Sequence, residues 1–190
     1  MSAADLADEE LMLRYQSGDA AAFDLLYGRH KGGVYRYLLR QCGGSAAAEE
    51  LAQDVWLNLI RAHASYTPSA KFTTYLYRLA HNRLIDHYRS QGKVVFLSAE
   101  EEEGGDLIEA MPAPPASDPA HQADQRSSAQ RMSAAIAALP AVQREAFLLQ
   151  QESGLAVEEI ATLTGVSFET AKSRLRYALA KLRAELKDLL

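Results

Sequence analysis

Two groups of basic side chains lie far apart in the sequence, and each contains groups that could contact nucleic acid. Residues 172–187 hold six Lys and Arg against one acidic residue, and residues 71–93 hold five against one. Lys and Arg neutralise phosphates, and Arg can also pair with a guanine edge. Residues 65–90 add four tyrosines and a phenylalanine, whose faces can stack on unpaired bases. The two stretches are compatible with nucleic-acid contact at two places.

The net charge of −5 argues against such a partner only until it is divided along the chain. Residues 1–92 are neutral, residues 93–126 carry −6 and residues 127–190 carry +1. The acidic middle stretch includes four consecutive Glu and four of the six prolines, and it shows no sustained periodicity. We interpret residues 93–126 as a flexible acidic linker between two small domains.

Helical periodicity dominates on both sides of this linker, and no stretch shows useful strand alternation. The sequence therefore predicts an all-α fold. Asp19 and Ser45 are candidate N-caps, and Pro140 suits the first turn of a helix. Before the linker, helices are expected at 8–16, over 23–41 after the Asp19 cap, after the Ser45 cap through Leu59, and at 72 to about 89. After it, they are expected at about 127–138, from Pro140 through Leu149, at 157–163 and at 168–186.

The last two of these helices match a helix-turn-helix. Ala161 is small enough for a close crossing, Gly165 permits the turn, and Ser167 can cap the second helix, with Thr170 at the third helical position. Ile160, Leu163, Val166 and Leu175 would form a miniature core.

Opposite the apolar face of the second helix, its N-terminal half carries hydrogen-bonding and cationic groups of the kind that meet base edges in a major groove. Lys172 stands at the edge of that face, and Ser173, Arg176 and Tyr177 point away from the core. Such a face could also be the wetted side of an ordinary amphipathic helix. The glycine turn and serine cap at this spacing favour DNA contact.

Residues 65–90 allow two interpretations that the sequence alone leaves open. Their aromatic and cationic side chains fit a surface for single-stranded nucleic acid. The spacing of Phe72, Leu76, Leu79, Ala80 and Leu84 fits a buried stripe equally well. On another face, Asn82, Asp86 and Arg89 can form a short polar chain with a structural role.

Neither an active site nor a metal centre is predicted. His81 and His87 are six residues apart, unlike a helical metal-binding pair, and the sequence lacks a P-loop and a GxSxG motif. The acidic pairs Glu49-Glu50 and Glu158-Glu159 stand at expected helix starts, where they complement the helix dipole. We therefore expect a protein that is not an enzyme and that uses no catalytic residue, metal or cofactor.

The sequence also predicts a cytoplasmic protein. Its first twenty residues contain acidic side chains and no apolar run, unlike a secretory signal, and no stretch reaches the roughly 18 apolar residues of a membrane helix. The single cysteine, Cys42, excludes an internal disulfide and fits a reducing compartment. Direct membrane insertion is not expected.

Two parts of the chain together resemble the extracytoplasmic-function (ECF, group IV) sigma factors of bacterial RNA polymerase, within the sigma-70 family. AAAEELAQDVWLNLIRA and KFTTYLYRLAHNRLIDHYRS are similar to region 2, and LPAVQREAFLLQQESGLAVEEIATLTGVSFETAKSRLRYALAKLR is similar to region 4. The resemblance covers nearly the whole chain. It implies a region 2 helical bundle over 1–92 and a four-helix region 4 domain with the helix-turn-helix over 127–190.

The resemblance also assigns roles by position. It implies docking on the β′ clamp helices of core RNA polymerase through Glu50, Gln53, Asp54 and Leu57, with Trp56 favoured as a core residue. It implies capture and melting of the −10 element by Tyr66, Ser69, Lys71, Phe72, Tyr75, Arg78, Asn82 and Arg83. It implies reading of the −35 element by Lys172, Ser173, Arg176 and Tyr177, with Arg174 as a phosphate contact.

By the same resemblance, the chain is expected to be an alternative sigma factor that directs promoter-specific initiation. The implied partners are core RNA polymerase (β′ clamp helices and β flap), promoter DNA and an anti-sigma factor, and the acidic linker would thread the nucleic-acid channel of the polymerase. Two positions depart from the family pattern. Ala156 replaces a capping Ser or Thr, and Tyr75 replaces a Trp.

Two other classes of protein compete with this interpretation. A DNA-binding regulator of the GerE-like type would bind duplex DNA without polymerase and would tolerate Asp54→Arg. A helical enzyme or adaptor would need a constellation of pocket residues that the sequence does not display. The sigma-factor interpretation predicts weak DNA binding by the free chain and loss of polymerase association on Asp54→Arg.

Overall fold

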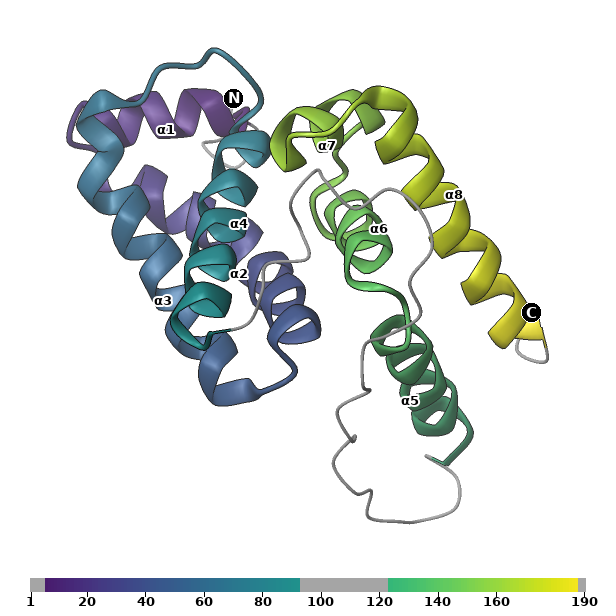
Figure 1. The fold of residues 1–190 in the computed structure, drawn as a ribbon. Coiled ribbons are helices and arrows are strands. Elements are labelled where there is room, and N and C mark those ends of the chain that lie inside the picture. The colour runs from purple at the N-terminus through teal and green to yellow at the C-terminus, as the bar shows by residue number, and fades with distance from the viewer. Residues whose placement is uncertain (1–5, 93–122, 188–190) are drawn as a thin grey trace.

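The computed structural model describes residues 6–92 and 123–187, and in these ranges every regular element is helical (Figure 1). The predicted all-α class is confirmed for the described residues. The N-terminal bundle comprises α1 (Asp8–Gln16), α2 (Ala20–Cys42), α3 (Ser45–Ala62) and α4 (Phe72–Ser90), with a short 3₁₀ turn at His63–Ser65. The C-terminal bundle comprises α5 (Ala123–Ala137), α6 (Ala141–Ser153), α7 (Val157–Thr164) and α8 (Phe168–Glu185).

The N-terminal bundle packs the long α2 against the other three helices. Leu26, Val34 and Leu38 of α2 are fully buried, as are Val55 of α3 and Leu76 of α4. Buried residues in α3 (Leu51, Val55, Leu59) and α4 (Leu76, Ala80, Leu84) recur every four positions, so each helix turns one apolar stripe inward and the stripes meet in a single core. Asp19 caps α2 as the sequence predicts, because its carboxylate accepts a hydrogen bond from the backbone N–H of Ala21 at 3.1 Å.

The predicted cap at Ser45 is wrong. Gly43 ends α2 in the left-handed conformation at φ 72°, and Gly44 follows as the extended N-cap of α3, so Ser45 is already the first helical residue. A two-residue turn leaves no other position for the cap. Glycine is needed only at Gly43, because the left-handed conformation there would strain a residue with a side chain, whereas any residue can adopt the extended conformation of Gly44.

The helix-turn-helix has the predicted local structure. Gly165 ends α7 with φ 72°, and the Ser167 hydroxyl accepts a hydrogen bond from the Thr170 N–H at 3.1 Å. Ile160 and Leu175 are buried between the two helices, whereas Leu163 and Val166 are half-buried at the edge of that core. The motif therefore presents α8 as a rigid, well-capped helix.

Helix α5 begins earlier than the sequence predicts. It starts at Ala123, so residues 123–126, which were assigned to the acidic linker, are helical. Ala, Gln and Arg are good helix formers, and the prolines that mark the linker end at Pro119, so charge composition placed the boundary too late. The rest of the predicted linker lies outside the described residues.

The two bundles lie against one another (Figure 1). Helix α6 packs on α2 and α4, α5 also touches α2, and α7 reaches α4. The described helices include none long and apolar enough to cross a membrane.

Candidate nucleic-acid and partner-binding surfaces

One side of α3 is exposed and combines polar with apolar groups. Glu50 and Gln53 are exposed, and Leu57 exposes 45% of its surface although Leu is usually buried. Ile60, which the sequence prediction omitted, is 36% exposed. It follows Leu57 by three positions and so extends the same face, which was the missed signal. An exposed apolar pair of this kind fits contact with another protein. Trp56, favoured as a core residue, is buried.

Asp54 joins this face to α4. Its carboxylate accepts a hydrogen bond from Arg83 at 2.5 Å, so a residue assigned to polymerase docking pairs with one assigned to DNA. Arg83 also lies 3.5 Å from Asp86, and Asp86 lies 4.0 Å from Arg89. The Asp86–Arg89 contact is one link of the predicted polar chain. Asn82, Arg83 and Asp86 together line an open groove of about 440 Å³ between α3 and α4.

Two aromatic residues that were expected to contact DNA are in the core. Phe72 is fully buried and Tyr66 is only 5% exposed, so neither side chain offers a surface to a base in this structure. The Tyr66 ring packs at 5.2 Å from that of Tyr75, and burial raises the pKa of the Tyr66 hydroxyl. Gln16 of α1 holds the segment between α3 and α4 in place, because its side-chain amide donates hydrogen bonds to the carbonyls of Ala64 and Tyr66. The buried-stripe interpretation therefore holds at the start of α4.

The other residues predicted for the −10 surface remain at least partly accessible. Ser69, Lys71, Arg78 and Asn82 are exposed, and Tyr75 is half-buried. The Arg78 guanidinium lies 5.9 Å from the centre of the Tyr75 ring, within reach of a cation–π contact. This pair presents an aromatic edge and a positive charge side by side, which is the combination that unpaired nucleic acid requires.

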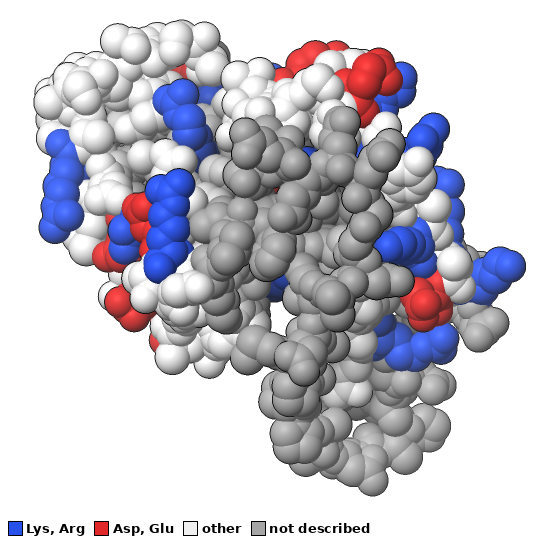
Figure 2. Space-filling model, viewed as in Figure 1, with Lys and Arg blue, Asp and Glu red and all other residues white. Residues whose placement is uncertain are grey.

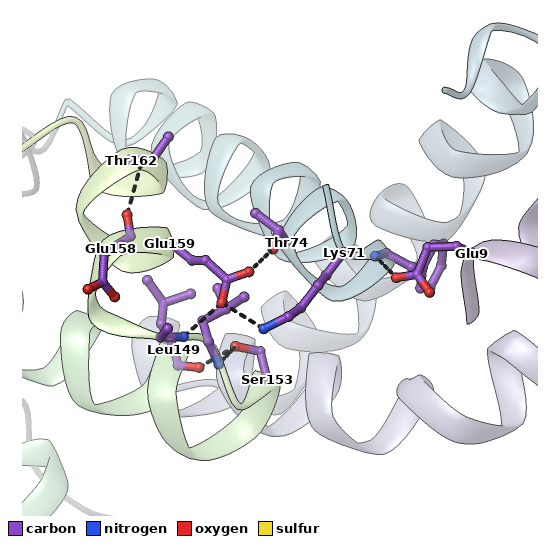
Figure 3. A network of polar contacts seen from close by, with 11 residues as sticks. Glu9, Lys71, Thr74, Leu149, Ser153, Glu158, Glu159 and Thr162 are labelled. Carbon is purple, nitrogen blue, oxygen red and sulfur yellow. Dashed lines mark hydrogen bonds and ion pairs between the residues drawn. The ribbon is translucent and has the colours of Figure 1, made fainter. Parts of the chain in front are cut away.

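The beginning of α4 is held by two carboxylates from other helices (Figure 3). Glu9 of α1 accepts a hydrogen bond from the Phe72 N–H at 2.6 Å. Glu159 of α7 accepts hydrogen bonds from Lys71 at 3.2 Å and from the Thr74 hydroxyl at 3.0 Å. Both acids complement the positive end of the α4 dipole.

Glu159 also binds within its own helix. Its carboxylate accepts a hydrogen bond from the Ala156 N–H at 2.8 Å, which is half of a capping box, because the Ala156 methyl group cannot supply the reciprocal bond. Partial burial alone would raise the pKa of Glu159. The hydrogen bonds from Ala156, Lys71 and Thr74 outweigh burial and lower it.

The outer face of α8 is open along its first half. Lys172, Arg176 and Tyr177 are exposed and Ser173 is half-buried, as the sequence predicts. The Arg176 guanidinium lies 5.0 Å from the centre of the Tyr177 ring. Phe168, which the prediction omitted, is 40% exposed below Lys172 and extends the face by one turn. Figure 2 shows Lys and Arg side chains following this edge of the molecule.

Arg174 does not belong to this exposed face. It is only 9% exposed and lies on the side of α8 that packs into the C-terminal bundle. Position 174 directly precedes the buried Leu175, so its side chain starts about 100° from the core direction, at the border of the packed side of α8. The observed exposure shows that the side chain is covered there. The burial of Arg174 therefore argues against the predicted phosphate contact at this residue.

The described residues contain no cluster of three His, Cys, Asp or Glu side chains arranged to hold a metal ion.

Comparisons with known proteins match both bundles. The family model described as Sigma-70 region 2 matches residues 26–94, and the model described as Sigma-70, region 4 matches residues 129–182. RNA polymerase sigma factor CarQ of Myxococcus xanthus is 32% identical over 178 residues, which cover 94% of this chain and 97% of the relative. ECF RNA polymerase sigma factor SigK of Mycolicibacterium vanbaalenii is 30% identical over 176 residues, covering 92% and 87%.

Solved structures show the same fold. CnrH in complex with the cytosolic domain of CnrY superposes with a TM-score of 0.66 at 22% identity, covering 96% of this chain and 99% of that one. The sigma factor RpoE of Bartonella quintana, solved with the anti-sigma factor NepR, gives a TM-score of 0.63 at 21% identity, covering 87% and 96%. At this level of identity the likeness concerns the arrangement of helices.

Proposed function

Because the chain belongs to the extracytoplasmic-function group of the sigma-70 family, it is an alternative sigma factor and not an enzyme, and we propose that its two bundles divide promoter recognition between α4 and α8. Residues 1–92 would act as region 2. Since α5 begins at Ala123, region 4 would span 123–190.

The open face of α8 carries this proposal. In a helix-turn-helix the second helix enters the major groove and reads base edges with its N-terminal residues. Lys172, Ser173, Arg176 and Tyr177 occupy that half of α8 and stay accessible, whereas Arg174 does not. We assign the −35 element to these four side chains. Phe168, one turn earlier, would add an apolar contact to a thymine methyl group or to the sugar backbone.

The −10 element is assigned to the accessible residues at and after the start of α4. Opening a duplex requires groups that hold the unpaired strand, since extruding a base costs stacking energy. Ser69, Lys71, Tyr75, Arg78 and Asn82 can supply hydrogen bonds, charge and an aromatic edge. Arg83 would join them only when it leaves Asp54. Tyr66 and Phe72 would support this surface from beneath.

Core RNA polymerase is assigned to the exposed side of α3. Glu50, Gln53 and Leu57 would meet the β′ clamp helices, together with Ile60 and the carboxylate of Asp54. The C-terminal bundle would contact the β flap. Acting on RNA polymerase places the chain in the cytoplasm.

An anti-sigma factor is the further partner that we propose. CnrH and RpoE were solved bound to partner proteins. This chain exposes two apolar residues on α3, Leu57 and Ile60, and two aromatic residues on α8, Phe168 and Tyr177. An inhibitory partner could cover them when the chain is not bound to polymerase. Co-purification of an untagged stoichiometric protein supports this part of the proposal. Full activity in cells that is unaffected by deletion of neighbouring genes contradicts it.

Arginine substitutions on α3 test the proposed docking on core polymerase. Asp54→Arg should abolish association with purified core polymerase and transcription from the DNA upstream of the chain's own operon. Leu57→Arg breaks no ion pair of the described structure and should give the same loss, which separates docking from folding. Asp24→Arg, at an exposed position of α2, is the matched control and should bind normally. Unimpaired transcription by both α3 variants contradicts the assignment. Polymerase-independent binding to duplex DNA that survives Asp54→Arg favours a regulator of the GerE-like type.

A further inference from the structure

Three glutamates of the C-terminal bundle contact the N-terminal bundle, and they are spaced seven residues apart. Glu145 and Glu152 lie on α6, and Glu159 lies in the first turn of α7. Seven residues make about two helical turns, so the two on α6 point to the same side. Each carboxylate meets a different part of α2 or α4.

Glu145 is the most deeply buried of the three, with 2% of its surface exposed. Its carboxylate accepts hydrogen bonds from the Tyr37 hydroxyl at 2.5 Å, from His81 Nδ1 at 2.9 Å and from the Gln41 amide. Burial and the neighbouring carboxylate raise the pKa of the Tyr37 hydroxyl well above its usual value, so the tyrosine stays a donor. Every one of these donors belongs to the N-terminal bundle. Separating the bundles would therefore remove all three bonds together.

Glu152 fixes the end of α6 on α2. Its carboxylate pairs with Arg36 at 2.9 Å, and its backbone carbonyl accepts a hydrogen bond from the Tyr77 hydroxyl at 3.0 Å. The approach is close because residue 33 is glycine. A Cβ at Gly33 would lie 2.7 Å from the Tyr77 hydroxyl and 3.2 Å from the Glu152 carbonyl oxygen.

Glu159 binds one cation, Lys71, that the proposed function assigns to DNA. It binds Lys71 and Thr74 at the beginning of α4 (Figure 3). A carboxylate that neutralises Lys71 stands where a phosphate oxygen would stand, so the C-terminal bundle and the −10 strand compete for the same cation.

The closed arrangement is too short to read both promoter elements. The −10 and −35 positions lie about 25 base pairs apart, or roughly 85 Å along B-DNA at about 3.4 Å per base pair. A compact chain of this length has a radius of gyration of only about 16 Å. The two bundles must therefore move apart on a promoter.

We propose that Glu145, Glu152 and Glu159 form an intramolecular latch that holds the free chain closed and opens when the chain engages polymerase and promoter. The second half of this statement rests on the proposed function; the first does not. The polar contacts of the latch suit reversible opening, because a carboxylate released from the interface regains its hydration. A released apolar contact would instead expose apolar surface to water. Until the bundles separate, the latch keeps the exposed Lys71 paired with Glu159.

Two substitutions open the latch without touching the proposed DNA-reading or polymerase-docking residues. Gly33→Ala should crowd the Tyr77 hydroxyl and the Glu152 carbonyl and so break the hydrogen bond that joins α4 to the end of α6. Gly28→Ala on the same helix is its control, since no described atom lies within 4 Å of a Cβ there. Alanine has the same intrinsic helix propensity at both positions of α2, so this effect cancels in the comparison. Glu159→Lys repels Lys71, and Glu158→Lys at the exposed neighbouring position is its control.

Distances between spin labels test the latch directly. Labels at exposed positions 24 and 181 of the full chain, introduced as Asp24→Cys and Lys181→Cys with Cys42→Ser, report the separation of the bundles. The wild-type background should give one narrow distance, and so should both controls. Gly33→Ala and Glu159→Lys should broaden the distance distribution and shift it to longer distances, because the contacts that hold the bundles together are weakened. A broad distribution in the wild-type background, or unchanged distances in both variants with intact helix content, overturns the latch.

Adding core polymerase separates the two proposals. Lengthening of the wild-type distance in a holoenzyme that transcribes supports both. A holoenzyme that transcribes while the label distance stays short overturns opening on engagement and leaves the proposed function standing. A chain that shows the narrow closed distance but neither binds nor activates core polymerase keeps the closed latch and removes the proposed function.

Discussion

The beginning of α4 and the first half of α8 carry similar side chains in different settings. On α8, Lys172, Arg176 and Tyr177 face solvent. On α4, Lys71 and Thr74 are engaged by Glu159 from the other bundle, and the aromatic residues around them are mostly packed away. The free chain thus leaves the α8 surface open, whereas part of the accessible −10 surface is already bound by a carboxylate of the other bundle. Position in the fold, more than residue type, decides which cations are available.

The difference in exposure between these two surfaces follows from how α4 and α8 are packed in the fold. Helix α8 is the outer member of a helix-turn-helix, so only one of its sides is needed for packing. Helix α4 lies between α3 on one side and α6 and α7 on the other, so its polar residues find partners within the chain. If this comparison holds, substitutions of the buried or Glu159-bound residues at the start of α4 should affect stability or closure, whereas those on the open face of α8 should affect DNA binding alone.

The largest effect is expected at Phe72, which is fully buried. Phe72→Ala should lower the free energy of unfolding by about 3–5 kcal/mol, because it removes a large apolar side chain and leaves a cavity. Urea denaturation of the full chain measures this. A variant as stable as wild type that fails only in promoter opening would return Phe72 to the DNA-contacting set and blur the comparison.

At Arg176 we expect a smaller effect, on DNA affinity and not on stability. Arg176→Ala should weaken holoenzyme binding to a promoter fragment by about 1–3 kcal/mol, the value of one good contact to a base edge, with no change in melting temperature. Arg183→Ala, an exposed cation later on α8, is the control and should bind almost normally. Equal losses for the two variants would mean that α8 contributes only general positive charge.

The two helices of the helix-turn-helix differ in their caps, which gives the third prediction. Ser167→Ala removes the hydrogen bond to Thr170 and should cost about 1 kcal/mol of stability. Ala156→Ser should supply the missing half of the α7 capping box and stabilise the chain by a similar amount. Thermal melts of both variants measure these effects. A destabilised Ala156→Ser chain would show that residue 156 cannot take the capping conformation.

The smallest effect is expected in the pH dependence of stability, at Asp8. Burial tends to raise the pKa of Asp8, but hydrogen bonds from His30 and Arg29 and their charges lower it below the usual 3.8. A carboxylate with a lowered pKa stabilises the fold above its unfolded pKa, and this contribution is lost as pH falls through the lower folded value. Asp8→Asn should therefore flatten the loss of stability below about pH 4, as measured by denaturation at several pH values. The exposed Asp24→Asn should leave the slope unchanged. The same slope in all three chains would show that the Asp8 contacts add nothing.

Much of the fold could be predicted because local signals determine it. Asp19, Gly165 and Ser167 act where the sequence places them, since capping and turn formation depend on residues within one helical turn. The apolar stripes of α2, α3 and α4 follow from periodicity alone. The sequence could not separate Gly44 from Ser45 as a cap, because both residues are acceptable N-caps.

The candidate site was less predictable because it depends on long-range packing. Tyr66 and Arg174 carry chemistry suited to DNA, and only the neighbouring helices show that both are covered. Glu145 gave no signal either: one acidic residue in an amphipathic helix normally faces water, and its three donors come from positions 64 to 108 residues away in the sequence. Glu159 was interpreted as a dipole partner of α7, and its contact with Lys71 depends on how the two bundles meet.

Sequencing of RNA 5′ ends after overexpression tests the central claim that this sigma factor reads two promoter elements through two bundles. Start sites that depend on the wild-type chain should align on two blocks of shared sequence, about 10 and about 35 base pairs upstream. Cells producing the Arg176→Ala chain should use fewer of these sites and lose those with the poorest upstream block first. Start sites that share only one block, or an upstream block whose importance does not change with Arg176→Ala, would contradict the account.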